Sequence, residues 1–263
     1  MNDMTEQRVL IVGSTGIGGE TAKLAARAGA RVFVVSRHEE NCQALAEEIQ
    51  STGGNCAYFA ADQTHEEQVE AAVASCVKAL GGVDALFNVA GISGRKFGDG
   101  PLHETSEAGW DVTLDTNVKG MFFFCRAVLN RMLEQEVAPS GLRGTILNMA
   151  SVLGFSPQRD FFATHAYAAS KGAIIGMTRS MASYYAPHKI RVNVLAPSLI
   201  RTPMSARAQQ SPEILSLMKK KQPLVEDMIE AIDVARAALF LLSDDSKVIT
   251  GDTLIVDAGW SIS

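Results

Sequence analysis

Short apolar runs alternate with longer amphipathic segments along this chain, and the alternation restricts the fold more than any other feature. Several runs hold four or more consecutive apolar residues, as strands covered on both faces do. The expected strands are Arg8–Val12, Arg31–Ser36, Cys56–Ala60, Ala85–Asn88, Thr145–Met149, Arg191–Leu195 and Thr253–Val256. The expected helices are Gly18–Ala28, Glu40–Ser51, Glu66–Leu80, Trp110–Glu134, Ala166–Tyr185 and Ile232–Leu242. This order predicts an α/β fold: a single doubly wound (Rossmann) domain over 1–263, with a seven-stranded parallel sheet flanked by helices on both faces.

Composition excludes several classes of function. The chain has 263 residues and a net charge of −5, which argues against a nucleic-acid-binding protein, since such a protein needs a basic face. The four cysteines lack CxxC pairs and the five histidines lack an HExxH motif, so no metal site is expected. No apolar signal core or membrane-length run is present, and we therefore expect a cytoplasmic protein that does not bind membranes.

A glycine-rich turn, VGSTGIGG, lies between the first expected strand and the first expected helix. Glycines let a backbone approach a pyrophosphate closely, and a helix N-terminus offers free N–H groups to it. The second expected strand ends at Ser36-Arg37, where an NAD-binding protein would carry an acidic residue for the ribose hydroxyl. Arginine instead pairs with a 2′-phosphate. The pair therefore favours NADP(H) over NAD(H), although Arg37 also fits an ordinary exposed cation beyond a strand.

Tyr167 and Lys171 are four residues apart at the start of an expected helix, so their side chains share one helix face. A nearby ammonium favours the phenolate, and we expect Lys171 to lower the pKa of Tyr167. Ser151 follows the carboxyl end of the fifth expected strand, the edge at which open α/β sheets bind ligands. Together with the glycine turn, these three residues predict an acid–base catalytic site beside a nucleotide.

From Arg8 to about Gly259, the chain resembles the short-chain dehydrogenase/reductase family, in its compact branch, and within it 3-oxoacyl-acyl-carrier-protein reductases. The matching segments are Asn88-Val-Ala-Gly91, DTNVKG around Asn117, and the Ser151, Tyr167 and Lys171 set. The resemblance implies that Tyr167 is the general acid or base and that Ser151 stabilises the carbonyl oxygen. It also implies that Lys171 holds the nicotinamide ribose and tunes Tyr167, and that Asn117 anchors a water connected to Lys171.

The resemblance also implies a set of cofactor contacts. It assigns adenine to Asp62 and the nicotinamide carboxamide to the segment from Pro197 to Thr202. The full set is Gly13, Ser14, Thr15, Gly16, Ile17, Gly18, Ser36, Arg37, Asp62, Gln63, Asn88, Ala90, Gly91, Tyr167, Lys171, Pro197, Ser198, Ile200 and Thr202. In the family the two long helices, Trp110–Glu134 and Ala166–Tyr185, pair between subunits, which implies a homotetramer or a homodimer.

The sequence departs from the family pattern at four places. The glycine turn is one residue short and also fits GxxGxxG, as in the extended branch of sugar epimerases, whose long C-terminal region is absent here. Val89 and Ser198 replace the usual Asn and Gly. Ser151 and Tyr167 are sixteen residues apart, about three more than usual, which lengthens the loop between them. Its members Arg159, Asp160, Phe161, Phe162 and His165 are candidate substrate neighbours, or simply residues that pack and solvate the loop.

Two functions follow from these observations. The first is an oxidoreductase that transfers a hydride between NADP(H) and a small-molecule ketone or secondary alcohol. The alternative is a protein that binds NADP(H) without catalysis. Three proline residues, Pro203, Pro212 and Pro223, interrupt the 198–223 segment, which we expect to be a substrate lid or a surface excursion with one short helix.

Overall fold

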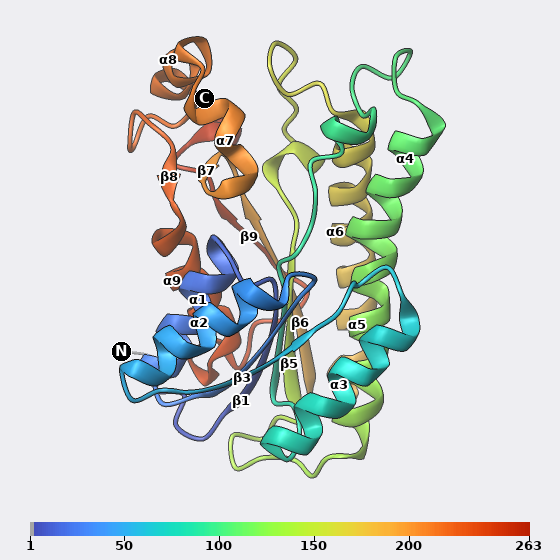
Figure 1. Cartoon of the computed structure of the whole chain (residues 1–263), viewed down its shortest axis with the longest axis vertical. Helices are drawn as coiled ribbons and strands as arrows, with labels where there is room; N and C mark the ends of the chain where they lie inside the picture. Colours follow the sequence, from blue (N-terminus) through green and yellow to red (C-terminus); the bar gives the residue numbers. More distant parts are fainter. Residues whose placement is uncertain (1–2) are drawn as a thin grey trace.

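The computed structural model describes residues 3–263, and a seven-stranded parallel sheet runs through its centre (Figure 1). The strands follow the order β3-β2-β1-β4-β5-β6-β9, and every neighbouring pair is parallel. They are β1 (Arg8–Val12), β2 (Arg31–Ser36), β3 (Asn55–Ala60), β4 (Ala85–Asn88), β5 (Gly144–Met149), β6 (Ile190–Pro197) and β9 (Thr253–Val256). The predicted α/β fold is confirmed. The strand order reverses between β1 and β4, and at such a switch point open α/β sheets bind ligands.

Helices cover both faces of this sheet (Figure 1). One face carries α1 (Ile17–Arg27), α2 (Glu39–Ser51) and α9 (Ala231–Leu242), and the other carries α3 (Glu66–Leu80), α5 (Gly120–Glu134) and α6 (His165–Tyr185). The strands alternate between the two cores: Val9 and Ile11 pack with the first group, whereas Leu10 and Val12 pack with the second. Both faces of β1 are therefore apolar, which explains its continuous apolar run.

One expected helix, Trp110–Glu134, is divided in the structure. It consists of α4 (Glu107–Leu114), a π-helical turn over Asp115–Lys119, and α5. The side chain of Gln63 donates a hydrogen bond to the carbonyl of Thr116 at 2.7 Å, within the turn. The π turn widens the helix at Asn117, and such bulges occur often at functional sites. The other expected helices differ from the observed ones by one residue or less at each end.

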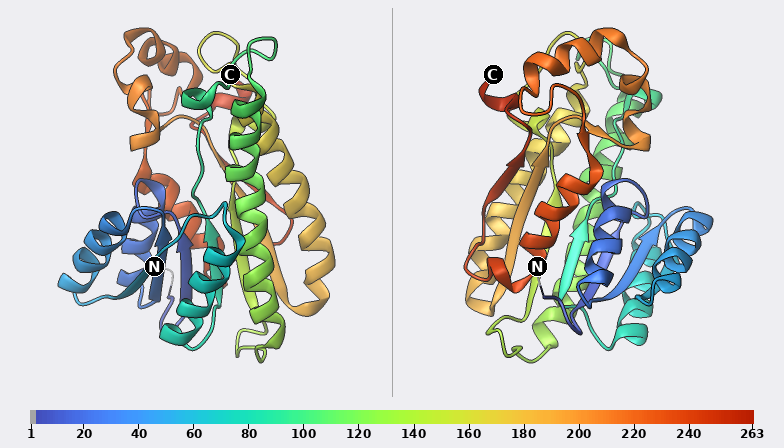
Figure 2. Two further views of the ribbon diagram at one scale, coloured as in Figure 1. Left: turned by 45° about the vertical axis from the view of Figure 1, so that its right-hand side comes forward. Right: turned by 90° about the vertical axis from the view of Figure 1, so that its left-hand side faces the viewer.

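The 198–223 segment contains more regular structure than the sequence suggests. It begins with β7 (Ile200–Arg201), which pairs in parallel with β8 (Ile229–Glu230), and continues through α7 (Ala206–Gln209) and α8 (Pro212–Lys221). Apolar side chains of α7 and α8 form a small third core with Val152 and Trp260. The segments that follow β4, β5 and β6 rise beside α7 and α8 at the upper end of the molecule (Figure 2).

The four cysteines are free and buried. Burial raises the pKa of Cys56, Cys76 and Cys125 to about 12, so these thiols stay protonated near neutral pH. Across residues 3–263, no cluster of His, Cys, Asp and Glu is arranged to hold a metal ion. A search of the same residues finds no helix with the length and apolar character needed to cross a bilayer.

Candidate active site

The glycine turn leads from β1 into α1 and is closed by main-chain contacts. The N–H of Gly13 donates to the carbonyl of Val35 at 2.8 Å. Gly16 has φ 54° and precedes α1 without a side-chain cap, which leaves the helix N-terminus open to an anion. A Cβ on Gly18 would lie 2.1 Å from the Gly13 carbonyl oxygen, so only glycine fits there. Val89, where the family has Asn, packs against this turn, and its Cγ1 would lie 3.1 Å from a Cβ on Gly13.

The two hydroxyl residues of the turn face different surroundings. Ser14 is buried, and its Oγ lies 2.8 Å from the Oγ of Ser36 at the end of β2. Ser36 in turn contacts the thiol of Cys42 at 3.1 Å. These bonds hold the shortened turn against β2. Thr15 is exposed, and Ile17 is the first residue of α1. The turn is thus shaped by Ser14 and leaves Thr15 at the surface.

Beyond β2, Arg37 is exposed, and its charge reaches Asp62 after β3. The pKa of Asp62 is lowered: partial burial raises it, but hydrogen bonds from the Thr64 N–H and hydroxyl, at 2.9 and 2.8 Å, outweigh that effect, and Arg37 adds to them. Asp62 is therefore ionised near neutral pH. Arg37 and Asp62 are therefore near enough for their charges to interact.

Three predicted residues lie at the carboxyl end of β4 or just after it. Ala90 donates its N–H to the carbonyl of Val12 at 2.7 Å and ties this segment to the glycine turn. Asn88 is buried and donates to the side chain of Asn148 at 2.9 Å, while its own Oδ1 has no hydrogen-bond partner. Gly91 lies beside the catalytic candidates, since a Cβ there would be 2.9 Å from Asn117 Oδ1 and 3.7 Å from Lys171 Nζ.

Asn117 lies buried in the π turn and is fixed on both sides of its amide. Its Oδ1 accepts from the N–H of Ile92 at 2.8 Å, and its Nδ2 donates to the carbonyl of Ile92 at 3.0 Å. The same Nδ2 lies 3.1 Å from the Oγ of Ser170, in the first turns of α6. Asn117 therefore connects the segment after β4 to the helix that carries Tyr167 and Lys171.

Ser151, Tyr167 and Lys171 converge beyond the carboxyl ends of β5 and β6. Ser151 is hydrogen-bonded to the phenol of Tyr167, and its Oγ lies 3.3 Å from the carbonyl of Pro197. The ammonium of Lys171 is buried, donates to the carbonyl of Met149 at 2.9 Å, and lies 5.4 Å from the centre of the Tyr167 ring. The structure thus brings the sequence-predicted residues to one edge of the sheet.

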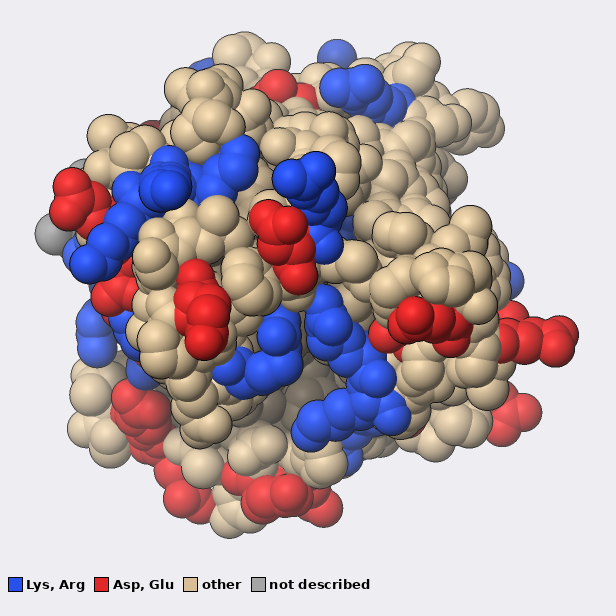
Figure 3. All heavy atoms as spheres, turned by 90° about the horizontal axis from the view of Figure 1, so that it is seen from above, with Lys and Arg blue, Asp and Glu red and all other residues tan. Residues whose placement is uncertain are grey.

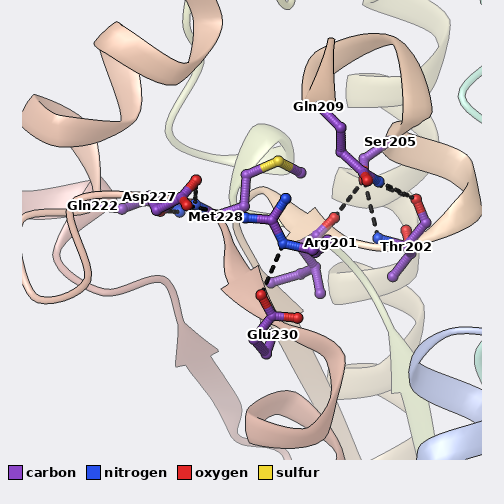
Figure 4. A network of polar contacts seen from close by, with 9 residues as sticks. Arg201, Thr202, Ser205, Gln209, Gln222, Asp227, Met228 and Glu230 are labelled. Carbon is purple, nitrogen blue, oxygen red and sulfur yellow. Dashed lines mark hydrogen bonds and ion pairs between the residues drawn. The ribbon is translucent and has the colours of Figure 1, made fainter.

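The remaining predicted contacts lie on the segment after β6 (Figure 4). Thr202 meets the glycine turn, because its Cγ2 would lie 3.0 Å from a Cβ on Gly16. Its N–H donates to Ser205 and its carbonyl accepts from Gln209 at 2.8 Å. Ser198 faces away from this contact: its hydroxyl donates to Gln222 Oε1 at 2.6 Å, and Gln222 donates to the carbonyl of Asp227. Ile200 is buried in β7.

Comparison with known proteins identifies the family. A family model described as "Enoyl-(Acyl carrier protein) reductase" matches residues 11–261. A crystal structure of a short-chain type dehydrogenase/reductase from Mycobacterium marinum superposes with a TM-score of 0.90 at 31% identity, over 99% of this chain and 98% of that one. The chain belongs to the short-chain dehydrogenase/reductase family. The resemblance seen in the sequence is confirmed.

Two curated relatives of this dehydrogenase/reductase are similar over nearly their whole length. The A-factor type gamma-butyrolactone 1'-reductase (1S-forming) of Streptomyces virginiae is 36% identical, over 98% of this chain and 97% of the relative. The 3-oxoacyl-[acyl-carrier-protein] reductase of Bos taurus is also 36% identical, over 95% of this chain and 96% of the relative. The chain is an NAD(P)-dependent short-chain dehydrogenase/reductase acting on CH–OH or C=O groups.

The pKa of Tyr167 in this dehydrogenase/reductase differs from the sequence-based expectation. Burial raises it above the ordinary value, and the hydrogen bond with Ser151 opposes that rise only in part. Lys171 lies 5.4 Å from the centre of the ring but is not among the groups that shift this pKa. The expected direction is wrong, because burial outweighs the other effects, and Tyr167 keeps its proton at neutral pH.

Asp99 is a site residue that the sequence did not reveal. It is buried in the loop after β4, and its two carboxylate oxygens accept the N–H groups of Ala166 at 3.0 Å and Tyr167 at 2.9 Å. The local candidate for this cap, Thr164, makes no such bond. A carboxylate at a helix N-terminus accepts hydrogen bonds from the free N–H groups and interacts favourably with the positive end of the helix dipole. Asp99 is therefore a positioning residue for Tyr167.

We expect Asp99→Asn to lower kcat about tenfold, because the amide offers one acceptor where two N–H groups need one each. Unfolding free energy should fall by about 1 kcal/mol. The Kd for NADP+ and the KM for the carbonyl substrate should stay within about twofold, since Asp99 touches neither the glycine turn nor Arg37. Steady-state kinetics and nucleotide titration measure these values. Asp111→Asn, on the exposed face of α4, is the control. An unchanged kcat, or an equal loss in the control, would contradict this role.

Proposed function

We propose that the chain reduces a ketone to a secondary alcohol with NADPH as the preferred cofactor, and that Tyr167 is the general acid. The observation that carries the proposal is the convergence of Ser151, Tyr167 and Lys171 at the carboxyl edge of the sheet, with Asn117 beside them. Tyr167 is protonated at neutral pH, which is the form that can donate a proton to a carbonyl oxygen. The reverse oxidation uses the same residues.

The residues of the glycine turn fit a dinucleotide. The open N-terminus of α1 offers free N–H groups to a phosphate, and Gly18 lets the start of the helix pack directly against Gly13. When bound, the nicotinamide supplies or accepts the hydride. The chain's own residues would hold the nucleotide through Gly13, Ser14, Thr15, Gly16, Ile17, Gly18, Ser36, Arg37, Asp62, Gln63, Asn88, Ala90, Gly91, Pro197, Ser198, Ile200 and Thr202.

Within this proposal, each catalytic side chain has one task. Ser151 donates a hydrogen bond to the carbonyl oxygen and stabilises the negative charge that develops on it. Tyr167 delivers its proton to the same oxygen. Lys171 places a positive charge beneath the phenol and favours the phenolate that remains. Asn117 fixes the widened turn of the helix and holds the route by which a proton returns to Tyr167.

The test is a spectroscopic assay of NADPH consumption with a panel of ketones, and of NADP+ reduction with the corresponding alcohols. We expect turnover with at least one pair. A protein that binds NADP(H) tightly and consumes none across the panel would instead support the alternative, a non-catalytic nucleotide-binding protein.

We expect Arg37→Ala to raise the Kd for NADP+ about tenfold and to leave the Kd for NAD+ unchanged, because a guanidinium pairs with the 2′-phosphate that only NADP+ carries. Arg37 is exposed and makes no salt bridge within residues 3–263, so its side chain is available to a phosphate. Calorimetric titration of both nucleotides gives the values. Arg27→Ala is the control: it removes the same charge at the C-terminal end of α1, the end that faces away from the glycine turn. Equal NADP+ affinity in wild type and Arg37→Ala would remove the phosphate assignment.

Two further parts of the proposal concern the lid and the assembly. We propose that 198–223 opens and closes over the substrate, hinged where Ser198 meets Gln222.

We also propose that α4, α5 and α6 pair between subunits in a homotetramer, because Trp110, Phe122 and Tyr184 expose large apolar side chains on these helices. A monomer in sedimentation equilibrium would contradict the second point.

A further inference from the structure

Two arginines converge beside the proposed active site. Arg95 lies in the short helix η1 (Arg95–Phe97) after β4, and Arg207 lies in α7. Both donate to one acceptor, the main-chain carbonyl oxygen of Phe161: Arg95 Nη2 at 2.6 Å and Arg207 Nη2 at 3.2 Å. Phe161 belongs to the lengthened loop between Ser151 and Tyr167. Two like charges from distant parts of the chain are therefore held against each other at this loop.

No carboxylate forms an ion pair with either arginine among residues 3–263. Asp99, the acidic residue whose charge acts on Arg95, already accepts two N–H groups of α6. Asp160, in the same loop as Phe161, is bound by Arg159 and Gln158. Arg95 is half-buried, whereas Arg207 is exposed beside it. A half-buried positive charge is normally paired, because an unpaired one loses hydration without a compensating partner.

The pKa of Arg95 shows the effect of this unpaired environment. Burial lowers the pKa of Arg95, and the neighbouring charge of Arg207 lowers it further, while Asp99 only partly opposes both. An anion placed between the two guanidinium groups would relieve this repulsion. Each guanidinium has five N–H donors, and the contact with Phe161 uses only one from each.

The position of the pair connects it to the substrate. Arg95 is four residues from Asp99, whose carboxylate holds the N–H of Tyr167, and Phe161 lies between Ser151 and Tyr167 in the chain. Seen from above, Lys and Arg side chains gather around a hollow in this end of the molecule (Figure 3). The pair is thus held against the loop that leads into α6, and Arg95 lies near Asp99, the residue that caps the start of that helix.

We propose that Arg95 and Arg207 bind an oxyanion of the substrate, so that the natural substrate is a ketone or secondary alcohol carrying a carboxylate or a phosphate group. This inference rests on the proposed function, because it assigns the substrate class of that same site. Arginine suits the task, since its planar guanidinium forms paired hydrogen bonds with carboxylate and phosphate oxygens.

The experiment compares charged and uncharged forms of one ketone. The probes are levulinate and other straight-chain oxo acids, their methyl esters, and phosphonates with the same carbon skeletons. Each is titrated calorimetrically into the NADP+-loaded protein: wild type, Arg95→Gln, Arg207→Gln and the double variant. Arg159→Gln is the matched control, since it removes a positive charge from the same loop with a side chain that is 95% exposed.

We expect at least one oxo acid to bind wild type about tenfold or more tightly than its ester. The preference should weaken in each single variant, vanish in the double variant and persist in Arg159→Gln, while ester affinity stays constant. A purely structural clamp would lower acid and ester affinity alike. The phosphonates separate the two anions, because a phosphate site binds them more tightly than the acids.

Equal binding of every acid and its ester, or a preference that survives in the double variant, would overturn the inference. Turnover is then measured separately with NADPH. Acids that bind preferentially but are never reduced would contradict the proposed function and leave the anion site intact. Acids and esters that bind equally and are reduced equally would contradict the anion site and leave the proposed function intact.

Discussion

Tyr167→Phe is expected to reduce kcat by about 10²- to 10⁴-fold, which is the range that a positioned proton donor contributes. The substitution removes one hydroxyl, together with its hydrogen bond to Ser151, and leaves the ring in place beside Lys171. Without a proton to deliver, the alkoxide that forms during reduction is stabilised by Ser151 alone. The Kd for NADP+ should change by less than about threefold, because the phenol contributes little to binding compared with the glycine turn.

The measurement combines steady-state kinetics with calorimetric titration of the nucleotide. Tyr58→Phe is the control, since it removes the same hydroxyl from β3, outside the proposed active site and the proposed subunit contact. Full activity in Tyr167→Phe would disprove its role as the general acid. A collapse of nucleotide binding would show that the phenol has a different task.

Lys171→Met is expected to make the nucleotide-free protein more stable at pH 7 by about 2 kcal/mol while abolishing turnover. Burial lowers the pKa of Lys171 from 10.5 to about 8, so the folded state holds a poorly hydrated charge. That shift corresponds to about 3 kcal/mol of lost stability below pH 8. Loss of the hydrogen bond to the carbonyl of Met149 offsets about 1 kcal/mol of the gain.

The stability difference between Lys171→Met and the wild type should depend on pH in a characteristic way. Between pH 8 and 10.5 the unfolded chain retains the Lys171 proton and the folded chain does not, so stability of the wild type rises with pH through this window. Below pH 8 both states are protonated, and the cost of the buried charge is constant. The advantage of Lys171→Met should therefore be largest below pH 8 and shrink as the pH approaches 10.5.

Urea unfolding of wild type and variant at several pH values, without nucleotide, measures this difference. Lys78→Met, on the exposed side of α3, is the control and should show no such pH dependence. A variant that is less stable than wild type at pH 7, or a difference that is constant up to pH 10.5, would contradict the buried-charge account.

Local pattern was enough to predict the sheet and most helices. The strands can be predicted because β1 and β2 are buried on both faces, which gives each of them an unbroken apolar run in the sequence. α3 was predicted with its observed ends, Glu66 and Leu80, because Gly81 in the left-handed conformation stops the helix at a place that the sequence marks. The placement of Ser151, Tyr167 and Lys171 followed from strand ends and helix spacing.

Features that depend on contacts between distant parts of the chain cannot be predicted from local sequence patterns. The π turn at Asn117 accepts a hydrogen bond from Gln63, which lies 53 residues before its acceptor Thr116, and DTNVK is as compatible with an ordinary helix. Asp99 caps α6 from 67 residues away, where no spacing rule applies. The pKa of Tyr167 was expected to fall because its spacing from Lys171 is visible in the sequence, whereas the burial that raises it is not.

The reversal of strand order between β1 and β4 has a consequence for how such a protein changes over time. The residues proposed to distinguish the nucleotide, Ser36, Arg37 and Asp62, lie at the ends of β2 and β3, on one side of that reversal. The residues proposed to bind the substrate anion lie on segments that follow strands of the other side: Arg95 comes after β4, and Arg207 comes in the excursion after β6. Mutations in one group leave the contacts of the other untouched, because side chains that share no partners act nearly additively. Preference for a cofactor and preference for a substrate can therefore evolve independently in this one sheet.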